Sequence, residues 1–172
     1  ILSLPGTQMF DEREQGFRDA FKLYPGIEVV QTGDTKADIA IAVSTAKAIL
    51  QKYPDLAAFV GTDSTAGMGA ATAVSEAGLV GKVKTVAMDR NSDVLQAIAA
   101  GTLTGSVAQD DAAMAFWGLQ VLYNYVHNQA PLTTDNKAAK ANTGPFNLLM
   151  NANYIDKSNL QYYLDANKLY AP

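Results

Sequence analysis

The fold is decided by the stretch YPDLAAFVGTDS at residues 53–64. Tyr53-Pro54-Asp55 ends a helical pattern, because a proline disfavours the helical conformation in the residue before it. Residues 57–60 are apolar and predict a short buried strand, after which polar Thr62-Asp63-Ser64 follow at once, with Ser64 as a candidate N-cap. A strand that runs through a polar turn into a helix is the repeating unit of a parallel α/β sheet.

The same unit recurs on both sides of this stretch. Further strands are predicted at residues 1–4, 27–31, 83–87 and 105–108. Helices are predicted at residues 9–24, 38–52, 64–76 and 93–100. The fold class is therefore α/β, with a parallel sheet of five strands and helices on both faces.

The pattern changes after the fifth predicted strand. Residues 111–127 form a longer and more hydrophobic helical pattern, and a polar stretch at residues 128–143 has the composition of a surface loop. A last strand is predicted at residues 146–149, and a terminal amphipathic helix ends near residue 168.

Composition narrows the classes of function. Apolar residues make up 48% of the chain and charged residues 17%, which predicts a folded globule and excludes a disordered tail. The net charge of −4 leaves no basic patch for phosphates, so no nucleic-acid partner is expected. No apolar run reaches the roughly 20 residues that a membrane-spanning helix needs.

Catalytic and metal sites find little support. The chain has no cysteine and a single histidine, His127, which lies near the end of a helical pattern where a solvent-exposed role is usual. Neither a nucleophile–base pair nor a typical zinc site can be assembled from these residues, and phosphate-loop motifs are absent. Gly67-Met68-Gly69 lies inside a helical pattern. We therefore expect a binding protein without catalytic residues, metal or cofactor.

Polar side chains follow every strand of the predicted sheet. In an open α/β sheet ligands bind at the carboxyl ends of the strands, so these residues are the candidate site. Carboxylates, an amide and a guanidinium suit a polyhydroxylated ligand, whose hydroxyls both donate and accept hydrogen bonds. Helix capping explains the same residue types without any ligand, above all at Asp34, Ser64 and Asn91. The residues in question are Arg13, Thr35, Asp63, Asp89 and Gln109.

The order and wording of these turns resemble the ribose-binding type of periplasmic binding proteins. This type I fold is shared with the effector domains of LacI-type regulators. The resemblance covers nearly the whole chain and rests on segments that are weak alone and fairly specific in order. They are DEREQGF at residues 11–17, YPDLAAFVGTD at 53–63, GKV at 81–83, VAMD at 86–89, GTLTG at 101–105 and VAQ at 107–109.

The resemblance implies roles for individual residues. In such proteins the positions matching Arg13, Asp63, Asp89 and Gln109 contact the sugar, and the Gln109 position lies at a hinge crossing. The aromatic residue often found after the second strand is replaced here by Gly33-Asp34-Thr35-Lys36, which leaves Thr35 as a possible contact and the identity of the sugar open.

The resemblance also implies a division of the chain. Residues 1–108 correspond to the carboxy-terminal ligand-binding lobe, residues 109–150 to the hinge crossing and a segment that packs on an amino-terminal lobe, and residues 151–172 to a terminal helix and tail. The chain opens on Ile1 without an initiator Met or a signal peptide, so we expect a fragment whose amino-terminal lobe is missing.

Two functions of different classes are compatible with this fold. The first is an extracytoplasmic solute-binding protein, periplasmic or anchored at the cell surface, that captures a sugar and delivers it to the membrane permease of an ABC transporter or to a receptor. The second is the effector domain of a LacI-type transcription regulator. An enzyme on a Rossmann-like sheet is a weaker alternative, because the phosphate loop and the nucleophile are absent.

Overall fold

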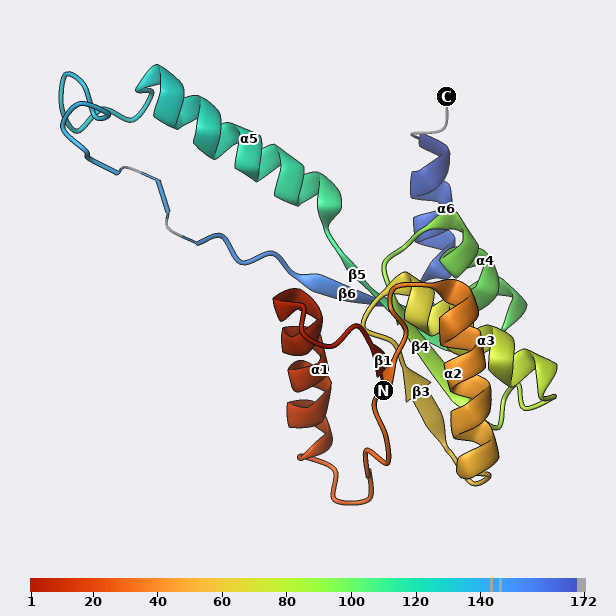
Figure 1. Ribbon diagram of the computed structural model, residues 1–172. Coiled ribbons are helices and arrows are strands. Elements are labelled where there is room, and N and C mark those ends of the chain that lie inside the picture. Colours follow the sequence, from red (N-terminus) through yellow and green to blue (C-terminus); the bar gives the residue numbers. More distant parts are fainter. Residues whose placement is uncertain (143, 146, 170–172) are drawn as a thin grey trace. The chain divides into compact units, whose positions relative to one another are not determined.

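Strands and helices alternate along the chain in the computed structural model, which describes residues 1–142, 144–145 and 147–169, with backbone only at 167–169 (Figure 1). The elements are β1 (Leu2–Ser3), α1 (Gln8–Phe21), β2 (Gly33–Asp34), α2 (Ile39–Lys52), β3 (Ala58–Val60), α3 (Ser64–Glu76), β4 (Lys84–Met88), α4 (Ser92–Ala100), β5 (Gly105–Gln109), α5 (Asp111–His127), β6 (Ala152–Ile155) and α6 (Leu160–Leu169).

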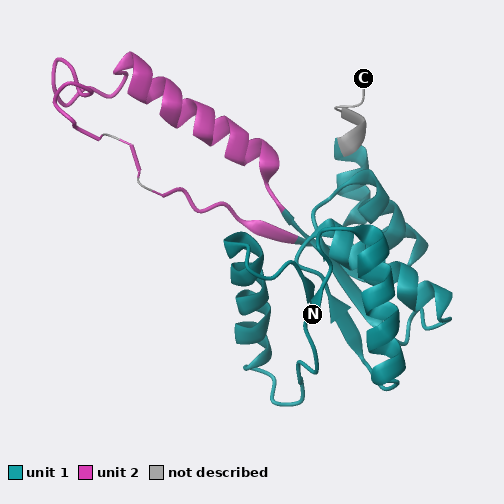
Figure 2. Ribbon diagram, in the orientation of Figure 1, with its two compact units in different colours: residues 1–108, 154–172 teal, residues 109–153 magenta. Residues whose placement is uncertain are grey.

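The chain divides into two compact units, coloured separately in Figure 2. Unit 1 comprises residues 1–108 and 154–172, and unit 2 comprises residues 109–153. Unit 1 therefore holds all of the predicted βα repeats, while α5 and the long segment after it belong to unit 2.

The strands of unit 1 pair in parallel. β1 pairs with β2, and a second sheet has the order β3-β4-β5-β6, in which β3, β4 and β5 are parallel. A parallel bridge between Leu2 and Gly61 links the two sheets. Figure 1 shows α2 and α3 on one side of these strands and α1 on the other. The α/β fold class is confirmed, although the expected single sheet consists of two sheets joined at one bridge.

Small residues let α3 lie close to its neighbours. A Cβ atom added at Gly67 would overlap Ala87 of β4, and one at Gly69 would overlap Ala42 of α2. Two buried clusters lie on this side of the strands, one around Phe59 and Val74 and the other around α4 and α6. Gly67 and Gly69 therefore serve the close packing of α3 against β4 and α2.

Two predicted strands are misplaced. Residues 27–31 form no strand. In the described part of the chain, Leu2 and Ser3 of β1 pair with Gly33 and Asp34 instead. Residues 147–149 form none either, and the strand begins at Ala152, where Ile155 can bury its side chain in the core. Phe146, the first residue of that prediction, lies outside the described residues.

Candidate functional site

Arg13 lies in the second turn of α1 and reaches the end of β3. Its Nη1 donates a hydrogen bond of 2.8 Å to the carbonyl oxygen of Thr62, and its guanidinium carbon lies 5.8 Å from the ring centroid of Phe10. The guanidinium is thus held between an aromatic ring and a backbone acceptor, a geometry that suits its flat, many-donor head.

Asp63 follows β3 and caps α3. Its Oδ1 accepts a hydrogen bond of 2.6 Å from the backbone N–H of Ala66, so Asp63 is the N-cap and the prediction of Ser64 in that role is wrong. The side chain is 9% exposed. Arg13 bonds the carbonyl of the residue before Asp63, so both residues lie at the carboxyl end of β3.

Buried hydroxyls lie beneath this point. The hydroxyl of Thr62 bonds that of Ser3 over 3.1 Å, and the hydroxyl of Thr35 donates to the Ser3 carbonyl over 3.1 Å. All three side chains are fully buried. In this conformation Thr35 offers no surface to a ligand and instead fixes the end of β1.

Asp89 follows β4 with an unusual backbone conformation. Its φ of 72° lies in the left-handed region, which aspartate tolerates better than most side chains. The backbone N–H donates to the Val107 carbonyl over 2.9 Å, and the carbonyl accepts a hydrogen bond of 2.6 Å from the hydroxyl of Ser106. The side chain of Asp89 is half-buried.

The register of the sheet places two of the candidate carboxylates at one level. Val60 of β3 pairs with Val86 of β4, and Asp63 and Asp89 each follow three residues later. Neighbouring strands lie about 4.8 Å apart, so both residues stand at the carboxyl edge of adjacent strands. Arg13, whose guanidinium bonds the Thr62 carbonyl, reaches the same edge of unit 1.

Gln109 ends β5 and is the first residue of unit 2. It lines a cavity of about 440 Å³ in that unit, together with Met114, Trp117 and residues 148–152. The structure thus describes its surroundings within unit 2, and its part in a sugar site stays a prediction.

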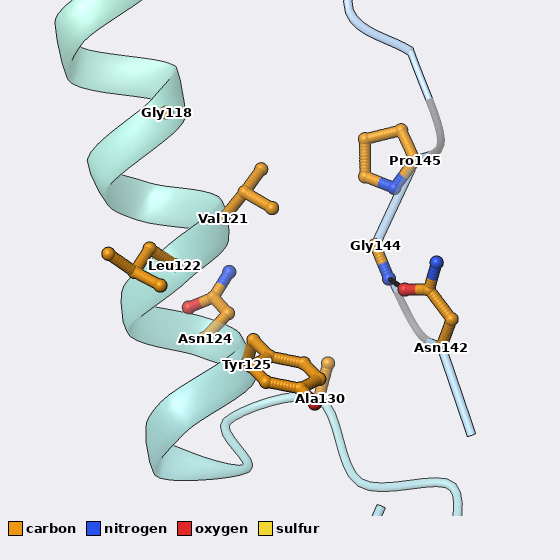
Figure 3. A pocket seen from close by; sticks show the side chains of 9 residues that line it. All are labelled: Gly118, Val121, Leu122, Asn124, Tyr125, Ala130, Asn142, Gly144 and Pro145. Atoms are coloured by element: carbon orange, nitrogen blue, oxygen red, sulfur yellow. Dashed lines mark hydrogen bonds between the residues drawn. The ribbon is translucent and has the colours of Figure 1, made fainter. Parts of the chain in front are cut away.

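A second cavity of unit 2, about 310 Å³, lies between α5 and the segment that follows it. Figure 3 shows Val121 and Tyr125 of α5 pointing toward Asn142 and Pro145. The cavity is lined by none of the predicted ligand residues. We therefore assign it to the packing of unit 2 rather than to the candidate site.

Other kinds of site are not supported by the part of the chain that the structure describes. Within it, no three His, Asp or Glu side chains gather as metal ligands would. Nor is any described helix both long and apolar enough to span a bilayer.

Sequence reasoning missed Ser3 and Ser106, the buried serines that hold the ends of β1 and β4. Both serines lie within predicted strands, where the sequence does not indicate a partner for a hydroxyl, and only the pairing of distant strands shows what each hydroxyl bonds. The candidate site therefore has an outer set of charged groups and an inner set of hydroxyls, of which the sequence indicated the outer set.

The chain is similar to proteins of one family. Residues 2–130 match the model of a periplasmic binding protein domain. The D-allose-binding periplasmic protein of Escherichia coli is 32% identical over 117 residues, which cover 68% of this chain and 38% of that protein. The D-ribose/D-allose-binding protein of Pseudomonas aeruginosa is 28% identical over 131 residues, covering 76% of this chain and 41% of that protein.

Solved structures agree with this match. A solute-binding protein of an ABC transporter from Agrobacterium vitis, bound with α-D-tagatopyranose, has a TM-score of 0.80 at 28% identity, with 99% of this chain and 53% of that chain covered. A sugar-binding protein from Bacillus halodurans has a TM-score of 0.84 at 24% identity, covering 94% of this chain and 55% of that chain, and shares the fold. The matched segments cover less than half the length of these curated relatives. It belongs to the periplasmic binding protein family, with the type I fold.

Proposed function

We propose that this chain is the carboxy-terminal half of an extracytoplasmic sugar-binding protein. The whole protein would capture a small sugar by hydrogen bonds between two lobes and deliver it to the permease of an ABC transporter or to a receptor. The observation that supports this proposal is that Arg13 bonds the chain just after β3, while Asp63 and Asp89 follow the carboxyl ends of the paired parallel strands β3 and β4.

The chemistry of these groups suits a neutral polyol. Carboxylates accept hydrogen bonds from hydroxyl groups and the guanidinium donates to hydroxyl oxygens, so one sugar can satisfy both kinds of group. Asp89 is the residue we expect to matter most, because a carboxylate can accept from two sugar hydroxyls at once. Gln109, at the end of the next strand, would contribute the amide.

The relatives narrow the ligand to a class. Their names include D-allose and D-ribose, and similar solved structures hold D-allose, D-arabinose or α-D-tagatopyranose. These are pentoses and hexoses without a charge. We therefore infer a neutral monosaccharide for this protein. The named relatives are binding proteins, which favours this function over the effector domain of a LacI-type regulator and over an enzyme.

The exposed apolar side chains of unit 2 favour the presence of a second lobe in the whole protein. α5 has no buried residue, and the exposed fraction of its Phe116 side chain is 59% and that of Leu119 is 68%. Several large apolar side chains exposed on one helix are typical of an interface. We propose that it packs on the amino-terminal lobe, since the chain spans only about half of the solved relatives.

Isothermal titration calorimetry on the whole two-lobed protein tests the proposal. The panel is D-allose, D-ribose, D-arabinose and D-tagatose. We expect one of them to bind, and Asp89→Ala to lower its affinity at least about twentyfold, since the sugar and the second lobe would bury the carboxylate and truncating a buried charged partner costs about 2 to 5 kcal/mol.

Asp55→Ala is the matched control. Asp55 is an exposed aspartate just before β3, at the opposite end of the strand from Asp63, so its replacement should leave the affinity unchanged. If Asp89→Ala bound the sugar as tightly as the parent protein, the assignment of this edge as the sugar site would be wrong.

A further inference from the structure

Asp89 alone among the predicted ligand residues has a positive φ. Two hydrogen bonds with β5 restrain its backbone. The Asp89 N–H donates to the Val107 carbonyl, and the Ser106 hydroxyl donates to the Asp89 carbonyl. An L-residue does not favour the left-handed region, so the conformation depends on the surrounding contacts.

The Ser106 hydroxyl is well placed for this task. Ser106 is fully buried and lies opposite Ala87 in the parallel register of β4 and β5. Its 2.6 Å bond to the Asp89 carbonyl is at the short end of the O–H···O range. A buried hydroxyl must find an acceptor, and here the acceptor belongs to the residue on which the proposed sugar contact depends.

Loss of the Ser106 hydroxyl would change the direction in which the Asp89 carboxylate points. Rotation about the N–Cα bond of Asp89 changes the direction of the Cα–Cβ bond relative to the strand, and the carboxylate moves with it. Without Ser106 the Asp89 carbonyl loses this hydrogen bond, and the bond to Val107 restrains the N–H. The carboxylate would then sample directions in which the sugar hydroxyls are out of reach.

We propose that Ser106 is a positioning residue that holds Asp89 in the left-handed conformation required for sugar binding. The proposal rests on the proposed function, and it concerns a side chain that itself touches no ligand. It assigns part of the sugar affinity of this edge to a buried hydroxyl on the neighbouring strand.

The test uses the whole two-lobed protein and the sugar of the panel that it binds most tightly. Ser106→Ala should weaken binding about threefold to tenfold, the range that corresponds to one neutral hydrogen bond. Ser106→Thr keeps a hydroxyl and should restore the affinity. In an Asp89→Ala background, Ser106→Ala should cause no further loss, because its effect passes through the carboxylate.

Thr85→Val is the matched control. Thr85 lies in β4, is 1% exposed, and its hydroxyl donates to the Thr102 carbonyl over 3.1 Å, away from the edge where Asp89 lies. It should lower the thermal stability as Ser106→Ala does and leave the affinity unchanged. Equal losses of affinity in the two variants would mean that Ser106 is merely structural and would overturn the proposal.

A measurement without sugar separates the two levels of the argument. The three-bond coupling between the amide and α protons of Asp89, which depends on φ, should change in Ser106→Ala. If the parent protein binds sugar and Ser106→Ala leaves either the coupling or the affinity unchanged, the role of Ser106 is wrong and the proposed function still stands. A parent protein that binds no sugar of the panel overturns the proposed function, and this role with it.

Discussion

α4 and α5 are both apolar helices, yet they differ completely in burial. In α4 of unit 1, Leu95 and Ile98 are fully buried against the sheet and α6. In α5 of unit 2 no residue is buried. The difference shows that a hydrophobic helix pattern specifies a surface that can pack, while burial requires a second surface. Unit 1 contains that surface, and for α5 we propose that the other lobe supplies it.

The sharpest test compares one leucine from each helix in the 172-residue chain. Leu95→Ala should lower the free energy of unfolding by about 2 to 5 kcal/mol, because it removes a fully buried side chain and leaves a cavity. Leu119→Ala, from a side chain that is 68% exposed, should change it by less than about 0.5 kcal/mol. Urea unfolding followed by circular dichroism measures both. Similar losses would show that α5 is packed within this chain.

Replacing one helical glycine from each unit should change the free energy of unfolding by a smaller amount, and in opposite directions. Gly67→Ala should destabilise the chain by about 1 to 3 kcal/mol, since the new Cβ would overlap Ala87. A Cβ at Gly118 of α5 meets nothing within 4 Å, so Gly118→Ala should stabilise the helix by up to about 1 kcal/mol through helix propensity. The midpoints of thermal unfolding of the two variants measure both changes in stability. A Gly67→Ala variant more stable than the parent would contradict the close packing of α3.

The smallest effect concerns pH at the turn where β6 leads into α6. The backbone N–H and the hydroxyl of Ser158 both donate to the Asp156 carboxylate and hold the pKa of Asp156 below its usual value. A carboxylate with a lowered folded-state pKa stabilises the fold above its unfolded pKa of about 3.8, and this contribution is lost as the pH falls through the folded-state pKa.

Ser158→Ala removes the hydroxyl donor and should raise the pKa of Asp156 toward its usual value. The carboxyl carbon shift of Asp156, followed by NMR between pH 2 and about pH 6, gives this value directly. Asp156→Asn should in addition flatten the acid dependence of stability slightly. A pKa of Asp156 that did not rise in Ser158→Ala would show that the backbone N–H groups of Ser158 and Asn159 lower it without the hydroxyl.

The local rules were sufficient for most elements. The end of α2 at Lys52 and the end of α4 at Ala100 were predicted correctly, because proline and glycine end helices through their own backbone preferences. α5 was predicted from Asp111 to His127, as observed. The strand predicted at residues 27–31 failed because β propensity does not say which partner a strand will find.

By itself, the sequence determined the α/β class, the positions of the helices and the charged residues at the carboxyl ends of the strands. These follow from periodicity, caps and turn residues, which act over a few neighbours. Only the tertiary structure decided that Asp63 caps α3, that Thr35 is buried, and that Ser106 bonds the carbonyl of Asp89. Each of these contacts except the cap joins residues at least 17 positions apart, and such pairs meet only through the register of the parallel strands.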